Sequence, residues 1–263
     1  MKKHNFSRSS LGIPYIVFMV LFVVLPVLII CYYAFTNGQG QFSVENFSMF
    51  FRNTRTIGTL LYSFSIAVIV TAVCLLLAYP VAYILAKCNL KRQGTLLLLF
   101  IMPMWINFTL RITALNEVLN FFEGNLARHP FLNTVIGMTY DFLPFMILPI
   151  YNTIAKIDDS YTEAALDLGV PPAKVLIKVI IPLSMPGIIS GVSMVFLPSM
   201  TNYVVLDMMH KSTYIIGSLI GSYFNMYDWH NGSVISLILL LIILFISMAS
   251  GELSIGKSRR ECQ

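Results

Sequence analysis

A long run without charge near the start of the chain most constrains what the chain can fold into. No Asp, Glu, Lys or Arg occurs in residues 9–44, and the apolar part of this run covers residues 11–35. At about 1.5 Å per residue, a helix of this length crosses the roughly 30 Å hydrocarbon core of a bilayer. The run is too long for the apolar core of a secretory signal and no small-residue cleavage site follows it, so we expect an uncleaved membrane helix.

The remaining sequence continues this pattern. Of the 263 residues, 57% are hydrophobic and 11% are charged, whereas a soluble domain has about 25% charged residues. A soluble enzyme and a nucleic-acid-binding domain are therefore excluded. The sequence predicts an all-α polytopic membrane protein, a single transmembrane domain over residues 1–263, with six spans at residues 11–35, 58–86, 95–115, 134–155, 187–206 and 233–250.

The basic residues predict the orientation of these spans. With an even number of spans both termini lie on one side, and Lys and Arg collect on the cytoplasmic side of membrane proteins. Placing the termini in the cytoplasm puts 12 of the 17 basic residues there, namely Lys2, Lys3, Arg8, Lys87, Lys91, Arg92, Lys156, Lys174, Lys178, Lys257, Arg259 and Arg260. The net charge of +5 is thus explained mostly by insertion topology, and we expect a multi-pass protein of the bacterial inner membrane, surrounded by lipid.

No residue pattern indicates catalysis or metal binding. The four cysteines and four histidines lack the spacing of a metal site. Residues 251–258 match the phosphate-loop pattern, but a membrane span precedes them and only five residues follow, so no strand and helix can complete a nucleotide site. We expect no catalytic residue, no metal ligand and no cofactor bound by this chain.

One predicted cytoplasmic loop, residues 156–186, has an ordered pattern of its own. Ser160 and Glu163 have the spacing of a capping box, which predicts the start of a short helix. Gly169 can supply the positive φ that ends this helix, and Pro171 and Pro172 suit the first turn of a second helix, over residues 173–180, that Pro182 terminates. The small side chains of the first helix permit close approach to a protein groove, although an interfacial helix resting on lipid is the alternative.

These residues resemble a known motif. Glu163, Ala164 and Ala165, with Gly169 four residues later, resemble the EAA motif in permease subunits of type I ABC importers. Other stretches, residues 143–151, 180–191 and 206–209, are similar to the spermidine/putrescine permeases of that family. The resemblance implies the type I importer permease fold, and it implies that Glu163, Ala164, Ala165, Leu168 and Gly169 contact an ATPase.

The resemblance also implies partners and cargo. It implies a second, homologous permease chain, two ATPase subunits that carry ATP and Mg²⁺, and a periplasmic polyamine-binding protein. Polyamine would move inward by alternating access as ATP binding moves the segment around Glu163. The alternatives are a permease for another solute delivered by a binding protein, and an ion-driven secondary transporter, for which inverted repeats and broken helices would be expected.

Charged and aromatic residues within the spans indicate a candidate substrate path. Asp141 lies within the fourth span, where an ionised carboxylate needs a partner or water. Two readings remain open: an ion pair with Arg111 that only holds two helices, or neutralisation of a cationic substrate together with Asp207. Trp105, Asn107, Tyr140, Asn202 and Tyr203 could line the same path, because aromatic faces attract ammonium groups, or could simply be interface residues.

Overall fold

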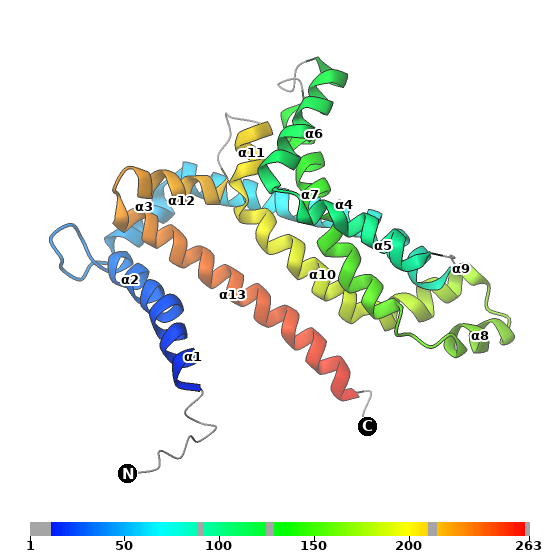
Figure 1. Cartoon of the computed structure of the whole chain (residues 1–263). Helices are drawn as coiled ribbons and strands as arrows, with labels where there is room; N and C mark the ends of the chain where they lie inside the picture. The colour runs from blue at the N-terminus through cyan, green and yellow to red at the C-terminus, as the bar shows by residue number, and fades with distance from the viewer. Residues whose placement is uncertain (1–11, 89–91, 125–128, 210–214, 261–263) are drawn as a thin grey trace, which may run out of the picture. The chain divides into compact units, whose positions relative to one another are not determined.

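The computed structural model describes residues 12–88, 92–124, 129–209 and 215–260, and within these it is almost entirely helical (Figure 1). In chain order, the described helices are α1 (Gly12–Met19), a π-helical turn (Val20–Val24), α2 (Leu25–Ala34), α3 (Glu45–Arg52), α4 (Thr54–Lys87), α5 (Gln93–Ile101), a 3₁₀ turn (Met102–Trp105), α6 (Phe108–Glu123), α7 (Pro130–Ile154), α8 (Ser160–Asp167), α9 (Pro172–Val175), a second π-helical turn (Leu176–Ile180), α10 (Ile181–Thr201), α11 (Tyr203–Met209), α12 (Ile216–Asn225) and α13 (Trp229–Arg260).

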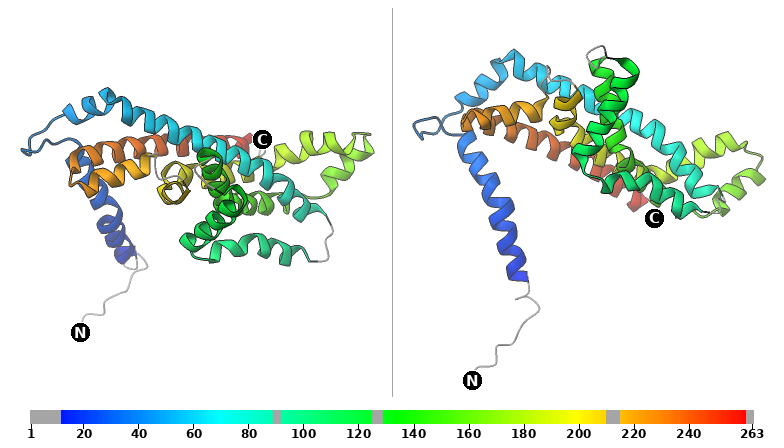
Figure 2. Two further views of the ribbon diagram at one scale, coloured as in Figure 1. Left: turned by 90° about the horizontal axis from the view of Figure 1, so that it is seen from above. Right: turned by 45° about the horizontal axis from the view of Figure 1, so that its top comes forward.

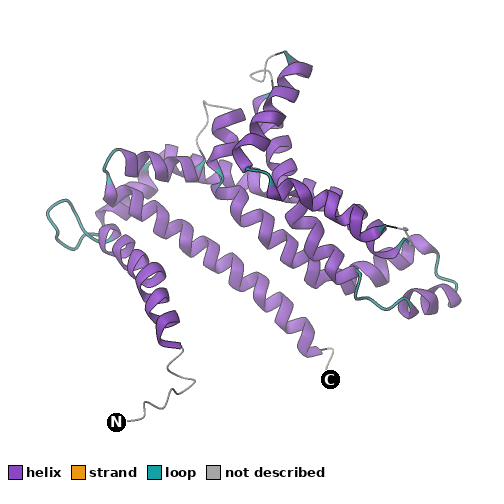
Figure 3. Cartoon of the chain, viewed as in Figure 1, coloured by secondary structure: helices purple, strands orange, loops and turns teal. Residues whose placement is uncertain are grey.

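The predicted all-α class is confirmed, and the membrane spans can be read from the helices. Among the described residues, five helices are long and apolar enough to cross a bilayer, and a sixth span results if the bent pair of α5 and α6 counts as one. The five are Pro14–Ala34, Thr54–Lys87, Pro130–Ile154, Pro172–Thr201 and Trp229–Met248. Shorter helices lie between these spans (Figure 3). Many large apolar side chains on these helices are exposed, as expected where lipid or another subunit covers them.

The third span differs from the expected continuous helix over residues 95–115. The segments Gln93–Trp105 and Phe108–Phe122 meet at an angle of 99°. Pro103 has no N–H to continue the α5 hydrogen-bond ladder, and Ile106 is extended. The Asn107 side chain then accepts hydrogen bonds from the N–H groups of Thr109, at 3.0 Å, and Leu110, at 3.4 Å, and so starts α6 in a new direction.

The expectation that Pro182 ends the second helix of the cytoplasmic loop is also wrong. The helix continues from α9 through the π-helical turn Leu176–Ile180 into α10, and Pro182 lies in the first turn of α10. A proline ring clashes with the carbonyl four residues earlier, and a π-helical turn widens the helix at that point. Pro26 follows the π-helical turn Val20–Val24 in the same way. In both spans, therefore, a π-helical turn before the proline lets the helix continue.

The chain divides into two compact units, each with its own packing. The larger unit contains residues 58–218 and 243–263, and its buried core includes two regular stripes at four-residue spacing. The stripe on α4 is Ile66, Val70, Cys74, Ala78 and Ala82, and the stripe on α7 is Met138, Phe142, Met146, Ile150 and Ile154. Such spacing places one face of each helix inward. The Cys74 thiol lies 3.8 Å from the Thr139 carbonyl, which joins α4 to α7.

Within this unit α10 packs along α7 (Figure 2), and Gly187 and Gly191 of α10 lie against α7. A Cβ at Gly187 would lie 2.5 Å from Oγ1 of Thr153 and 2.8 Å from the Pro149 carbonyl oxygen. A Cβ at Gly191 would lie 2.7 Å from Sδ of Met146. Only glycine permits this approach, so the spacing Gly187/Gly191 sets how closely the two spans pack.

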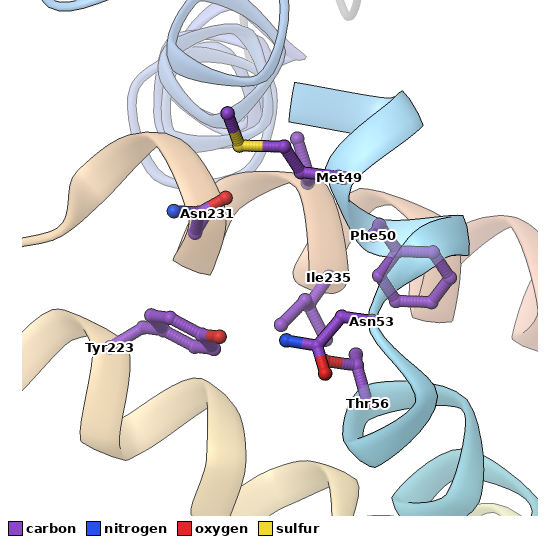
Figure 4. A pocket seen from close by; sticks show the side chains of 8 residues that line it. Met49, Phe50, Asn53, Thr56, Tyr223, Asn231 and Ile235 are labelled. Carbon is purple, nitrogen blue, oxygen red and sulfur yellow. The ribbon is translucent and has the colours of Figure 1, made fainter. Parts of the chain in front are cut away.

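The smaller unit contains residues 1–57 and 219–242. The Tyr33 ring stacks on Trp229 with centroids 6.1 Å apart, and its carbonyl lies 3.0 Å from Nδ1 of His230, which fixes the end of α2 against the start of α13. A small cavity of about 120 Å³ lies between α3, α12 and α13. Asn53, Thr56 and Tyr223 turn toward it (Figure 4), and its polar lining carries no charge.

Candidate functional site: the α8 segment and a charged cavity

The first candidate site is the α8 segment, defined here as residues 158–171. The helix ends in a Schellman motif: the Gly169 N–H donates to the Leu166 carbonyl at 2.8 Å, and the Val170 N–H donates to the Ala165 carbonyl at 3.1 Å. Gly169 has a φ of 76°, which a side chain would disfavour. The predicted helix end is therefore confirmed, and the turn into α9 pairs the carbonyls of Ala165 and Leu166 near the end of α8.

The predicted capping box at the start of α8 is wrong. Ser160 is the first helical residue and not the cap, and its N–H donates to the Asp158 carboxylate at 2.9 Å. The hydrogen bond from the Ser160 backbone lowers the pKa of Asp158 below its ordinary value of 3.8, and the nearby Lys87 charge acts in the same direction. Asp158 thus binds the orphan N–H two residues on, directly before the helix, while the N-cap residue Asp159 makes no side-chain cap hydrogen bond.

Lys87, the last residue of α4, ties the α8 segment to the membrane helices. Its ammonium group donates to the Ile157 carbonyl at 2.6 Å and to the Asp159 carboxylate at 2.5 Å. The Lys87 side chain is 14% exposed and that of Asp159 is 75% exposed. A partly buried charge thus joins residues 72 positions apart in the chain. This contact connects the α8 segment to the end of α4.

The five residues predicted to contact an ATPase all lie on or directly after α8. Glu163, Ala164, Leu168 and Gly169 are exposed, and Ala165 is half-buried. Leu168 is 84% exposed, although it is apolar. Figures 1 and 2 place α8 and α9 at the end of the larger unit away from α6. An exposed apolar side chain beside small residues forms a surface that another protein can cover.

The second candidate site is a cavity of about 310 Å³, near the lower limit of ligand-binding pockets. It lies against α7 at two breaks in the helical structure, one between α5 and α6 and one between α10 and α11. Its lining consists of Met104, Ile106, Phe108, Arg111, Asp141, Phe142, Phe145 and Asn202. Irregular backbone at membrane depth is tolerated where it lines a cavity, and both breaks do so here.

The two charged residues of this lining form an ion pair. A guanidinium nitrogen of Arg111, from the first turn of α6, contacts the Asp141 carboxylate, and both side chains are buried, at 6% and 4% exposure. Arg111 also donates to the Pro103 carbonyl at 2.7 Å and lies 5.8 Å from the centre of the Tyr140 ring. The ion pair between the third and fourth spans, which the sequence offered as one of two alternatives, is therefore present. It lies in the wall of the cavity.

The other residues predicted for the substrate path lie outside this lining. Trp105 ends the 3₁₀ turn and is 75% exposed, and Asn107 caps α6. Tyr203 starts α11 and is 45% exposed, and Asp207 is exposed on the same helix. The structure brings Asp141 together with Asn202 but with none of these four.

Sequence patterns did not identify the aromatic lining residues Phe108, Phe142 and Phe145 as site residues. They lie in apolar runs, where a phenylalanine facing a cavity looks like one facing the core. Pro103 followed by Asn107 was a usable signal for the helix break that forms the cavity. Among the described residues, no group of three His, Cys, Asp or Glu side chains could hold a metal ion.

Comparisons with known proteins place these features in a family. The family model described as "Binding-protein-dependent transport system inner membrane component" matches residues 5–251. The chain is 35% identical over 246 residues to the spermidine/putrescine transport system permease protein PotB of Escherichia coli, covering 86% of this chain and 90% of that protein. It is 32% identical over 260 residues to PotB of Haemophilus influenzae, covering 89% and 91%.

Solved structures share the fold. A bacterial ABC transporter that imports the acidic polysaccharide alginate matches with a TM-score of 0.68 at 13% identity, covering 93% of this chain and 94% of the matched chain. The MetNI methionine ABC transporter matches with a TM-score of 0.57 at 14% identity, covering 76% and 94%. At these identities the likeness concerns the fold, which is that of ABC importer permeases.

Proposed function

The chain belongs to the family of binding-protein-dependent transport system inner membrane components, and from this we propose that it is a permease subunit of an ABC importer that moves polyamines inward. It is a multi-pass protein of the inner membrane. The observation that carries the proposed cargo is the identity of 32–35% to spermidine/putrescine permeases over most of both chains. As the proposal has it, the six spans form one transmembrane domain with both termini in the cytoplasm.

In this proposal the α8 segment is the coupling element. Glu163, Ala164, Ala165, Leu168 and Gly169 contact an ATPase subunit, which binds and hydrolyses ATP with Mg²⁺. The exposed Leu168 and the hydrogen-bonded turn at Gly169 support this role, because they present an apolar side chain on a helix end with a defined conformation. The tie from Lys87 to Asp159 gives a route by which movement of the segment reaches α4.

The proposed assembly contains two ATPase subunits, a second homologous permease chain of the PotC type and a periplasmic polyamine-binding protein. The binding protein delivers the cargo to the outer side, and the two permease chains enclose the path. On the side of the path that this chain forms, Asp141 lies in a cavity wall. Trp105, Asn107, Tyr203 and Asp207 lie on the elements around it. The exposed positions of these four leave them accessible to a second chain.

One experiment tests the assignment. The chain is purified from its native membrane with whatever binds it, and the complex is reconstituted in proteoliposomes with ATP inside and labelled spermidine outside, together with the copurifying binding protein. We expect copurification of an ATPase and a second permease, and ATP-dependent uptake. Uptake by this chain alone under an ion gradient would contradict the proposal. ATP-dependent uptake of another solute instead of spermidine would contradict the proposed cargo but support the assignment as an ABC importer.

A further inference from the structure

We propose that Arg111 is an exchangeable internal cation, which occupies the Asp141 carboxylate when the cavity is empty and yields it to an ammonium group of the cargo. This inference rests on the proposed function, since it concerns how the same path recognises a cationic solute. It assigns Asp141 as the cation-binding group of the cavity. It assigns Arg111 as the residue that keeps the cavity wall neutral between transport events.

The charges of the lining support the exchange. Arg111 and Asp141 are the two charged residues among the described residues that line the cavity, and both are buried. While they are paired, the wall has no net charge, so a cation entering the cavity would find no compensating carboxylate. Burying an unpaired charge is costly. An ammonium group can therefore bind here only if it takes Asp141 from Arg111.

Arg111 has other partners that remain after it releases Asp141. Its second terminal nitrogen donates to the Pro103 carbonyl at 2.7 Å, and its guanidinium lies over the Tyr140 ring. A carbonyl and an aromatic face both stabilise a cation, so the displaced guanidinium would not be left unpaired. Nε of Arg111 has no hydrogen-bond partner in the structure, so the pair with Asp141 is not a fully satisfied structural network.

The position of Arg111 connects the exchange to the bend between α5 and α6. Arg111 lies in the first turn of α6, where its N–H donates to the Asn107 carbonyl at 3.1 Å, directly after the 99° bend. Its side chain bridges that bend to Pro103 and reaches across to Asp141 on α7. A change in the bend therefore alters the distance between Arg111 and Asp141. Helix ends and loops are the places where transporters absorb such motion.

The cavity also fits the rest of an aliphatic amine. Phe142 and Phe145 lie on α7 beside Asp141, and Phe108 lies on α6. Aromatic rings bind methylene groups through apolar contact and ammonium groups through their faces. The Asn202 side chain supplies an amide oxygen that can accept a hydrogen bond from an amine. The ligand class that this set recognises is a flexible alkyl chain with primary ammonium groups.

The test compares three variants in the complete reconstituted transporter, with labelled spermidine as the probe. Asp141→Asn removes the carboxylate, and we expect ATP-dependent uptake to fall roughly 30-fold or more, as for loss of a buried charge partner. Arg111→Met leaves the carboxylate free for the cargo, and we expect uptake within about fivefold of the unmodified transporter. The double variant, which has no buried charge at either position, should be as inactive as Asp141→Asn.

The double variant decides between exchange and a purely structural pair. If the pair only holds helices, removing both charges restores what each single change loses, and uptake returns to the unmodified rate; this result would overturn the inference. The thermal unfolding midpoint of each purified complex shows that the proteins compared are folded. Normal spermidine uptake by Asp141→Asn would overturn the inference alone, whereas an unmodified transporter that imports no spermidine would overturn the inference and the proposed cargo together.

Discussion

The α8 segment and the charged cavity are organised in opposite ways. In the α8 segment, neighbours in sequence make most of the structure: Asp158 accepts a hydrogen bond from the Ser160 N–H, and the Gly169 N–H donates to the Leu166 carbonyl three residues earlier. In the cavity, Arg111, Asp141 and Asn202 come from three parts of the chain and are held by helix packing. The first region should thus respond to changes in local conformation, and the second to changes in packing between helices and in buried charge.

The largest effect should come from packing that supports the cavity. In Gly187→Ala the added methyl group meets Thr153 and the Pro149 carbonyl on α7, so α10 must move away. We expect a loss of about 1–3 kcal/mol in unfolding free energy, as for overpacked cores. Thermal unfolding of the purified complex in detergent measures it. Gly221→Ala is the matched control, since a Cβ there has no neighbour within 4 Å, and equal losses in the two variants would contradict close packing as the cause.

A glycine-to-alanine substitution in the α8 segment should act through backbone conformation alone. Gly169→Ala meets no neighbour within 4 Å but puts a side chain at a φ of 76°, which costs about 1–2 kcal/mol. We expect the helix end to shift, so that transport-coupled ATP hydrolysis drops while the membrane helices stay folded. ATPase assays on proteoliposomes with cargo and binding protein measure the coupling. Gly94→Ala, at an exposed helical glycine with no neighbour within 4 Å, should leave the coupling unchanged.

Lys87 combines the two kinds of organisation. Its contact with the α8 segment joins residues far apart in sequence, whereas the segment itself is built from sequence neighbours. Lys87→Met removes the hydrogen bond to Ile157 and the ion pair with Asp159. Exposed pairs contribute about 0.2–1 kcal/mol, so we expect a reduction in uptake of at most about fivefold. Asp159→Asn should have a similar effect, and Lys174→Met is the control on the same loop. A full loss of uptake in Lys174→Met with no loss in Lys87→Met would show that transport does not depend on the contact between Lys87 and Asp159.

The smallest effect concerns pH. The lowered pKa of Asp158 means that the stability from its hydrogen bond with the Ser160 N–H is fully present above the ordinary value of 3.8 and is lost as pH falls through the lower folded value. Binding of the ATPase to the α8 segment should therefore show no dependence on Asp158 between about pH 6 and 8. Titrating binding in the unmodified chain and in Asp158→Asn tests this expectation. A difference in pH profile within that window would contradict it.

The same contrast explains how much of the molecule could be predicted from its sequence. The end of α8 at Gly169 was predictable because a glycine before two prolines determines it locally. The start of α8 at Ser160 was predictable too, but the capping box was not, because two carboxylates, of Asp158 and Glu163, compete for the Ser160 N–H and Asp158 binds it. The ion pair of Arg111 and Asp141 could be offered as one of two alternatives, since each buried charge needs a partner.

The breaks in the helices could not be predicted from hydropathy. An apolar run predicts a span but not its direction, so it predicts a continuous helix where the chain bends at Pro103 and Asn107. Pro182 predicts a helix end because proline lacks the N–H of the next helical hydrogen bond, whereas the π-helical turn before it lets the helix continue. The aromatic lining of the cavity depends on which face of α7 meets α6, and that is decided by contacts between distant residues.

The most direct test of the whole account is the number of spermidine molecules imported per ATP hydrolysed by the reconstituted transporter, measured side by side for the unmodified chain, Asp141→Asn and Gly169→Ala. The account predicts that Asp141→Asn hydrolyses ATP but imports little spermidine, because coupling is intact and the cation site is lost. It predicts that in Gly169→Ala hydrolysis and import fall together. An unchanged ratio and unchanged rates in both variants would contradict it.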